Sequence, residues 1–555
     1  MLFLLGCSGY QFTDQHLPGR YTYAIGKGMS HAKKITLTHK NNLINKNTMI
    51  AKSLKITSCL ISLFLFIQAN GSTLKVEDAG AKSDGKTLNT NYIQKAIDQV
   101  ASEGGGTVVL EHGIYLSGTI FLKSNVTLRI EAGATLLGSP NISDYKELTW
   151  GHNVDRQPYH LIVADNTENI QIEGKGTIDG NGEAFWQEYE KDAQGKMIVP
   201  RWIKAKDKKV SPLIEITRSR NISIDDVTIH TGGGWNLHLF DCDVAKVRGV
   251  NIVNNVYSPN SDGIDITGCN DVIVSDCYIK TCDDAVCLKT TEDSRECHRV
   301  TVTNCIIETL CVGLKMGCVE SNKDMTDVTF SNCIINKSSR AIGIYAKDGA
   351  VYDRITISNI TANTNAPLIL NRPLQIMVNR WKDTSPLGGI RNVLISNFIC
   401  ETEGQIMLTC GEGGFMENIV LRDIALRYPM IEDPKPMSST TTSGQYPKFV
   451  DHPEAVGAQA AVVAENISNL VIDNLQVEWP TTNTIPDAWK YPERIENGSG
   501  RIHHLNYSKA KQTEFSVFWG NNIHGGYIYA PLAKSSDDQK VKFDVRNSTV
   551  QLTTQ

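Results

Sequence analysis

Four aspartates lie close together in the middle of the chain, in two groups separated by one short apolar segment. The first group lies within Pro259–Asp265, which reads Pro-Asn-Ser-Asp-Gly-Ile-Asp, and the second is Asp283-Asp284, which follows Cys282. Carboxyl groups that meet in space raise the pKa of at least one of them unless a cation, water or substrate intervenes. Perturbed carboxyls of this kind are typical of functional sites, so we interpret the two groups as one candidate site.

The apolar segment between the two groups belongs to a repeat that must position them. The repeat reads apolar-x-apolar-x-x-apolar-x-apolar, usually with Asn or Asp before the third apolar position. Its clearest run starts at Val272, Val300, Val328 and Ile355, a period of 27 or 28 residues. Alternation on both sides of a short bend predicts two strands joined at a corner. Such units bury their apolar faces only by stacking, so the pattern predicts an all-β solenoid, a parallel β-helix.

The repeat predicts where the aspartates meet. Equivalent residues in successive coils of a β-helix lie about 4.8 Å apart. Asp262 and Asp284 then occupy the same position in adjacent coils, with Asp283 beside them. An Asp-Gly turn is the simpler explanation for any single aspartate, and Asp265 could merely bond its own loop. Three aspartates on adjacent coils favour a site instead.

Cysteine is frequent but does not follow a metal-binding pattern. Twelve of the 14 cysteines lie beyond residue 72. Those at apolar repeat positions are expected to pack as small buried hydrophobes, with Cys277, Cys305 and Cys333 in one inward-facing ladder. The cysteine spacings match no zinc pattern, so we predict no metal site and no cofactor.

Composition limits the classes of partner. A net charge of −5, 21% charged residues and no basic run argue against a nucleic-acid partner. Residues 49–72 resemble a signal peptide, with Lys52 and Lys55 before the apolar stretch Cys59–Ile67. That stretch is too short to span a bilayer comfortably. We therefore expect a secreted protein, periplasmic or extracellular, that starts at Met49.

The chain divides into five expected parts. They are a doubtful leader or misassigned start (1–48), the signal peptide (49–72), an N-terminal cap with the first coils (73–139), the β-helix catalytic domain (140–480) and a C-terminal capping segment (481–555). Helical periodicity predicts one capping helix over Asn89–Glu103. Two insertions, Gly182–Pro212 and Arg427–Ala460, interrupt the repeat and are expected to form walls of a binding site.

Several motifs together resemble one known family. These are Gly80–Gly85, Gly104–Thr107, Gly133–Leu136, Trp235–His238, Asn260–Gly263 and Cys282–Asp284. The chain resembles glycoside hydrolase family 28, the polygalacturonase group of right-handed parallel β-helix pectinases, over roughly residues 73–480. The resemblance implies hydrolysis with inversion. Asp283 would be the general acid, and Asp262 and Asp284 would hold the attacking water.

The sequence departs from the family's pattern at two motifs. The Gly-His-Gly motif aligns with Cys311–Gly313, so Val312 replaces the histidine. The Arg-Ile-Lys motif aligns with Tyr345–Lys347, so only the lysine is kept.

Four residues are expected to bind substrate. They are Lys347, Lys315, His238 and Tyr345. Lys315 would replace a lost cation, although it could equally be a solvated surface lysine.

The resemblance implies an exported enzyme, expected as a monomer, that cleaves α-linked galacturonic-acid-containing pectic glycans. Exo-action on oligosaccharides is the expected mode. Two alternatives stay open. One is a polysaccharide lyase that holds calcium on the aspartates, and the other is a non-catalytic glycan-binding β-helix.

Overall fold

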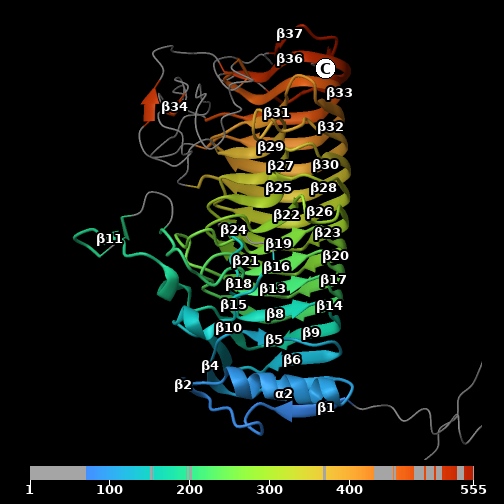
Figure 1. Ribbon diagram of the computed structural model, residues 1–555. Coiled ribbons are helices and arrows are strands. Elements are labelled where there is room, and N and C mark those ends of the chain that lie inside the picture. The colour runs from blue at the N-terminus through green and yellow to red at the C-terminus, as the bar shows by residue number, and fades with distance from the viewer. Residues whose placement is uncertain are drawn as a thin grey trace, which may run out of the picture. The chain divides into compact units, whose positions relative to one another are not determined.

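The apolar repeat forms strands that stack in parallel, coil upon coil. In the computed structural model, successive coils follow the chain order, from the blue N-terminal coils to the red C-terminal ones (Figure 1). The structure describes residues 71–555 except for the following positions: 151–152, 154, 196, 199–202, 367–370, 430–453, 456–457, 481–492, 496–504, 508–514, 534–542 and 554–555. The leader and most of the signal segment therefore lie outside the described residues.

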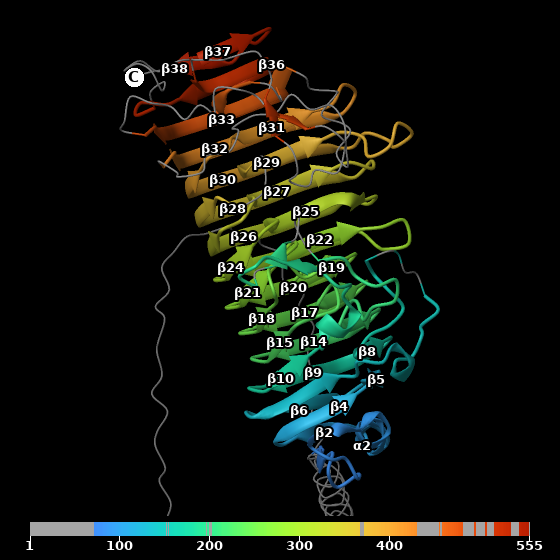
Figure 2. The ribbon, with the colours of Figure 1, turned by 90° about the vertical axis from the view of Figure 1, so that its left-hand side faces the viewer.

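The strands form three parallel ladders along the β-helix (Figure 2). The site ladder contains β5 (Ile120–Phe121), β8 (Ile162–Asp165), β13 (Ile214–Thr217), β16 (Leu237–Phe240), β19 (Ile264–Thr267), β22 (Val286–Thr290), β25 (Val312–Ser321), β27 (Arg340–Ala346), β29 (Arg372–Val378), β31 (Ile406–Cys410) and β37 (Phe543–Arg546). The second contains β1 (Ser72–Lys75), β3 (Gly106–Leu110), β6 (Val126–Ile130), β9 (Glu168–Gly174), β14 (Arg220–Asp225), β17 (Asp243–Arg248), β20 (Asn270–Ser275), β23 (Cys297–Thr303) and β38 (Gln551–Thr553). The third contains β2 (Asp84–Leu88), β4 (Gly113–Ser117), β7 (Ala134–Gly138), β10 (Thr177–Asp179), β15 (Thr228–His230), β18 (Asn251–Val253), β21 (Tyr278–Thr281) and β24 (Ile306–Thr309).

Six longer strands serve more than one ladder. They are β26 (Met325–Asn336), β28 (Val351–Thr364), β30 (Gly389–Thr402), β32 (Phe415–Arg427), β33 (Ala460–Glu478) and β36 (Ser516–Tyr529). Two short antiparallel pairs lie outside the ladders: β11 (Glu190–Lys191) with β12 (Met197–Ile198), and β34 (Glu493–Ile495) with β35 (Leu505–Tyr507). Two short 3₁₀ helices, η1 (Ile142–Asp144) and η2 (Gly182–Phe185), complete the described elements.

The Asn or Asp before the third apolar position forms the corner of each coil. Asn304, Asn332 and Asn359 all have φ between 54° and 57°, the left-handed region that Asn tolerates better than most residues. The side-chain amide of Asn359 donates to the amide oxygen of Asn332 at 2.9 Å. The corner residues thus form a hydrogen-bonded ladder of their own.

The interior is filled by apolar side chains from all three ladders. Val272, Val300, Val328 and Ile355 lie opposite one another on successive coils, which confirms the predicted period. Every cysteine that the structure describes is a free thiol and is buried. The inward-facing cysteine ladder is also confirmed, because Cys277, Cys305 and Cys333 occupy matching positions and are at most 2% exposed.

The predicted helix is present as α2 (Thr90–Ser102), which buries Ile93, Ile97 and Val100. It packs against β1, β3, β5 and β6, near the blue end in Figure 1. Within the described part of the chain, no helix is long and apolar enough to cross a membrane. Most of the insertion Arg427–Ala460 falls among residues that the structure does not describe.

Candidate active site

The two aspartate groups meet because neighbouring strands pair in the predicted register. Strands β19 and β22 are parallel neighbours, which places Asp262 and Asp284 at equivalent positions of adjacent coils. The backbone N–H of Gly263 donates to the carbonyl of Asp284 at 2.9 Å. A Cβ atom on Gly263 would lie 2.4 Å from the carbonyl oxygen of Ala285. Glycine therefore permits the close approach of the two coils at this point.

Side-chain hydroxyls fix the turn that carries Asp283. The hydroxyls of Thr281 and Thr309 both donate to the backbone carbonyl of Asp283. One residue earlier, the backbone N–H of Cys282 donates to the Ser261 hydroxyl at 3.0 Å. Ser261 lies next to Asp262 in the sequence, so this bond ties the two aspartate turns together. Asp262, Asp283 and Asp284 are 3, 7 and 3% exposed.

Lys289 joins the site as a cation that the sequence analysis did not single out. Its ammonium nitrogen lies 2.9 Å from Asp265 Oδ1 and 3.3 Å from Asp262 Oδ2. The same nitrogen lies 3.4 Å from the centroid of the Trp235 ring, within the range of a cation–π contact. The pKa of Lys289 is raised, because Asp265, Asp262 and Glu320 outweigh the effect of burial. Asp265 is therefore a fourth carboxyl of the site.

The pKa values of Asp262 and Asp284 are shifted in opposite directions. Burial, together with Asp265 and the other aspartates, holds the pKa of Asp262 well above its usual value, although Lys289 opposes the shift. Burial also acts on Asp284, but its ion pair with Lys315 and the field of Lys289 leave its pKa lowered. The pKa values of two neighbouring carboxyls are thus shifted in opposite directions, as is common where carboxyls take different roles in acid–base catalysis.

Lys315, on the coil next to Asp284, pairs with that aspartate. It contacts Asp284 directly, and its side chain is 12% exposed, so the alternative of a solvated surface lysine is wrong. The other oxygen of Asp284, Oδ1, is buried, and a side-chain hydrogen bond from Cys311 contributes to lowering the pKa of Asp284.

A bulge in β25 brings a further carboxylate to the site. β22 and β25 pair in register as far as Leu288 and Met316, but Thr290 then lies opposite Ser321. The extra residues of β25 therefore lie beside Lys289. Cys318 within the bulge has a φ of 104°, a strained value of the kind that clusters at functional sites. The bulge carries Glu320, which contributes to raising the pKa values of Lys289 and Lys315.

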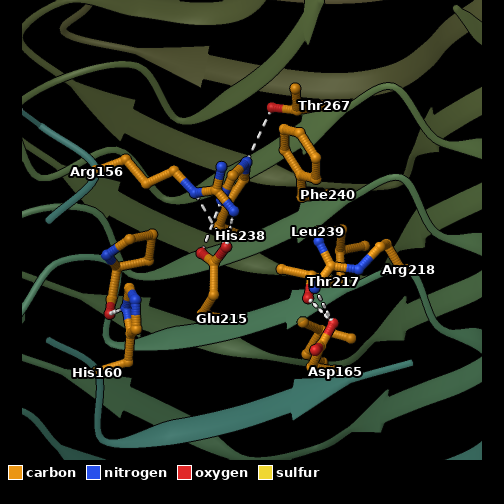
Figure 3. Close-up of polar contacts among 12 residues, drawn as sticks. Arg156, His160, Asp165, Glu215, Thr217, Arg218, His238, Leu239, Phe240 and Thr267 are labelled. Carbon is orange, nitrogen blue, oxygen red and sulfur yellow. Dashed lines mark hydrogen bonds and ion pairs between the residues drawn. The ribbon is translucent and has the colours of Figure 1, made fainter. Parts of the chain in front are cut away.

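Arg156, Glu215 and His238 form a buried charge network (Figure 3). Arg156 bonds the carboxylate of Glu215 through Nε at 3.0 Å and also through Nη2. The other oxygen of Glu215 lies 2.8 Å from His238 Nδ1, and His238 Nε2 lies 2.9 Å from the Thr267 hydroxyl. Both ring nitrogens of His238 are thus engaged within the protein. The His238 ring lines the cavity described below. Its two nitrogens bond Glu215 and Thr267.

Lys347 and Tyr345 lie together, with Trp381 nearby. Lys347 is 2% exposed, and its ammonium nitrogen lies 5.7 Å from the Tyr345 ring centroid and 5.8 Å from that of Trp381. Burial lowers its pKa. The Tyr345 hydroxyl lies 3.1 Å from Gln375 Oε1. The structure therefore places both predicted binding residues in one buried cluster.

A cavity of about 530 Å³ opens beside this cluster. Among its lining residues are Trp235, His238, Lys289 and Trp381. Lys289 connects the cavity directly to Asp262. Its volume lies within the range of about 300–1,000 Å³ that is typical of small-molecule sites.

Asp283 and Asp284 lie close to a third potential metal ligand, Cys311. One oxygen each from Asp283 and Asp284 and the Cys311 sulfur lie within 4.8 Å of one another. Calcium prefers six to eight oxygen ligands, and this group offers a thiol and two oxygens. Lys315 already neutralises Asp284. The donor set therefore does not fit the calcium site that a lyase would need.

The comparisons with known proteins agree with this geometry. The family model of glycosyl hydrolases family 28 matches residues 110–443, more than half of the chain. This chain belongs to glycosyl hydrolases family 28. The earlier resemblance is therefore confirmed.

Individual relatives match only part of their length. A probable polygalacturonase from Vitis vinifera is 32% identical over 238 residues, 41% of this chain and 46% of the relative. An exo-poly-alpha-D-galacturonosidase from Dickeya chrysanthemi is 28% identical over 255 residues, 38% of this chain and 41% of the relative. The chain thus spans less than half the length of these curated relatives.

A solved structure supports the fold. The exopolygalacturonase of Thermotoga maritima superposes with a TM-score of 0.58 and 20% identity, covering 74% of this family 28 chain and 93% of that structure. The likeness confirms the parallel β-helix.

Proposed function

We propose that this chain hydrolyses α-linked galacturonic-acid-containing pectic glycans with inversion at the anomeric carbon. The observation that carries the proposal is the set of three buried aspartates, Asp262, Asp283 and Asp284, on adjacent coils of a family 28 β-helix. The relatives' names, polygalacturonase and exo-poly-alpha-D-galacturonosidase, support the substrate class. The proposal includes export, with activity in the periplasm or outside the cell.

In the proposed mechanism, Asp283 protonates the departing glycosidic oxygen while Asp262 and Asp284 hold the attacking water. Asp284 suits this task because Lys315 keeps it ionised and able to accept a proton from water. An inverting enzyme needs about 6.5–9.5 Å between acid and base so that a water fits opposite the leaving group. Because the pKa of Asp262 is raised, the pH profile of activity is a direct test of its role.

Product analysis tests the proposal. The purified chain is incubated with polygalacturonate, rhamnogalacturonan and short oligogalacturonides, and the products are separated and followed by NMR for anomeric configuration. Hydrolysis with inversion gives saturated products whose new reducing ends start as the β-anomer. Unsaturated products that absorb in the ultraviolet, or activity lost on chelation, would indicate a lyase instead. If none of the α-galacturonides is cleaved, the proposal is refuted.

A further inference from the structure

The cavity beside Lys289 has a strongly acidic lining. Four of its lining residues carry carboxylates: Glu292, Asp293, Glu320 and Asp348. Glu292 and Asp293 are exposed, whereas Glu320 and Asp348 are partly buried. They come from three separate places: the turn after β22, the bulge of β25 and the turn after β27. Acidic side chains therefore approach the cavity from several coils.

The cations that line the cavity are already neutralised, with one exception. Arg156 is bonded to Glu215, and Lys289 lies between Asp262 and Asp265. Among the lining residues that the structure describes, Lys382 is the one cation without an ion pair, and it is exposed. The cavity therefore has an excess of negative charge. A carboxylate that entered it would meet like charges at short range.

The remaining lining favours a sugar without a charge. Trp381, which is partly exposed, supplies apolar surface, against which the C–H face of a sugar ring can pack. Carboxylates accept hydrogen bonds from hydroxyl groups, and two or three such acceptors around an apolar floor are the usual design of a small-molecule site. The hydroxyls of a neutral sugar satisfy these acceptors without adding charge.

We infer that this cavity receives an uncharged sugar residue of the substrate, next to the galacturonic acid whose bond is cleaved. The preferred substrate class is then a glycan in which galacturonic acid and neutral sugars adjoin, rather than an uninterrupted galacturonate chain. This inference rests on the proposed function, since it concerns the same site. Glu320 is the specificity-determining residue, because the bulge of β25 places it beside Lys289.

The test compares three substrates that differ in charge. Short oligogalacturonides are compared with rhamnogalacturonan oligosaccharides of equal length, and with oligogalacturonides whose carboxyl groups are partly reduced to primary alcohols. We expect kcat/KM to be about tenfold or more higher for the substrates with neutral residues. Glu320→Gln should raise kcat/KM for oligogalacturonides several-fold, roughly as expected for the removal of one nearby like charge. Asp348→Asn should act in the same direction, because it removes a second carboxylate from the lining.

Two controls accompany these variants. Glu168→Gln removes an exposed carboxylate of β9 that does not line the cavity. It should leave unchanged the ratio of kcat/KM for substrates with neutral residues to kcat/KM for oligogalacturonides. Added salt should reduce this ratio in the wild-type protein, because salt screens repulsion between exposed charges. This salt measurement keeps the test valid if a variant fails to fold.

The outcomes separate the two proposals. Cleavage of no α-galacturonide refutes the proposed function. The charge inference is overturned if two results are found together. Oligogalacturonides are cleaved at least as fast as the substrates with neutral residues, and neither the variants nor salt changes the ratio of the kcat/KM values. The proposed function then still stands.

Discussion

Asp262 and Asp284 are both buried, but their pKa values shift in opposite directions because their ion pairs differ. Lys315 pairs with Asp284, while Lys289 is shared between Asp262 and Asp265. A shared cation stabilises each ionised carboxylate less than a dedicated one does. This difference explains why the pKa of Asp262 is raised and that of Asp284 is lowered.

Asp283→Asn is expected to abolish turnover without affecting folding. Loss of a positioned general acid costs roughly 10²–10⁴-fold in rate, and the amide is nearly isosteric with the carboxyl. Activity on oligogalacturonides and circular dichroism measure the two effects. Asp262→Asn and Asp284→Asn should be similarly damaging, whereas Asp271→Asn, which removes only the exposed pair with Arg299, should retain activity. Near-normal rates in any two of the three site variants would reject the assignment.

Lys289→Met should identify the role of Asp262 through the pH profile of kcat/KM. Lys289 lowers the pKa of Asp262, so its loss raises that pKa further. If Asp262 must be ionised to hold water, activity is lost as pH falls through its pKa, and the acid limb moves to higher pH. If Asp262 is instead the acid, the alkaline limb moves to higher pH. A profile with both limbs unchanged would show that Asp262 controls neither limb.

Glu215 should make stability depend on pH in a defined window. Burial raises its pKa, but His238 and Arg156 outweigh burial and lower it from 4.5 to about 2. The folded pKa lies below the unfolded one, so the stabilisation is fully present above about pH 4.5 and is lost as pH falls toward about 2. Its size is on the order of 3 kcal/mol.

Chemical denaturation of Glu215→Gln and the wild-type protein at pH 6 and pH 3 measures this contribution. The wild-type protein should be clearly more stable at pH 6, with a smaller advantage at pH 3. An advantage that stays constant between the two values would contradict the assigned ionisation of Glu215.

At the scale of the elements, the corner of each coil determines how neighbouring strands meet. Asn332 has a φ of 54° and accepts a hydrogen bond from Asn359. Asn332→Ala should destabilise the fold by about 1–2 kcal/mol through the left-handed backbone and by about 1 kcal/mol through the lost hydrogen bond. Asn332→Gly should lose only the second part. Denaturation midpoints of the two variants test this difference, and equal losses would exclude the backbone contribution.

The sequence was sufficient to predict the elements but not all of the site. Strict spacing from Val272 to Ile355 gave the register, and the register placed Asp262 beside Asp284. Lys289 could not be singled out, because it follows the second aspartate group at a position that belongs to no recognised motif. Glu320 could not be predicted, since a bulge changes register without changing the apolar pattern.

The buried charge network of Arg156, Glu215 and His238 joins residues that are distant in the sequence. Arg156 and Glu215 lie 59 residues apart, and nothing in the local sequence around either residue connects them. A buried Glu within the apolar strand β13 was the available signal, because such a residue requires a partner.

For the whole molecule, mode of attack remains the main prediction. The insertion Gly182–Pro212 contributes Gln187, Ile203 and Lys209 to a second cavity of about 430 Å³, alongside Asn260 from the loop that carries Asp262. A wall at this place favours a pocket that receives a chain end, and hence exo-action. We expect monosaccharide or very short products, with little loss of polymer viscosity per new reducing end. A rapid fall in viscosity with few new ends would mean internal cleavage.

The stacking of coils in chain order also has a consequence for how the protein is made. Every described residue assigned to the site or its cavity lies between Asn153 and Lys382, and each coil contacts mainly its neighbours. Synthesis proceeds from the N-terminus at about 5–20 residues per second. The coils that carry the aspartates can therefore be complete while β30 to β38 are still being added.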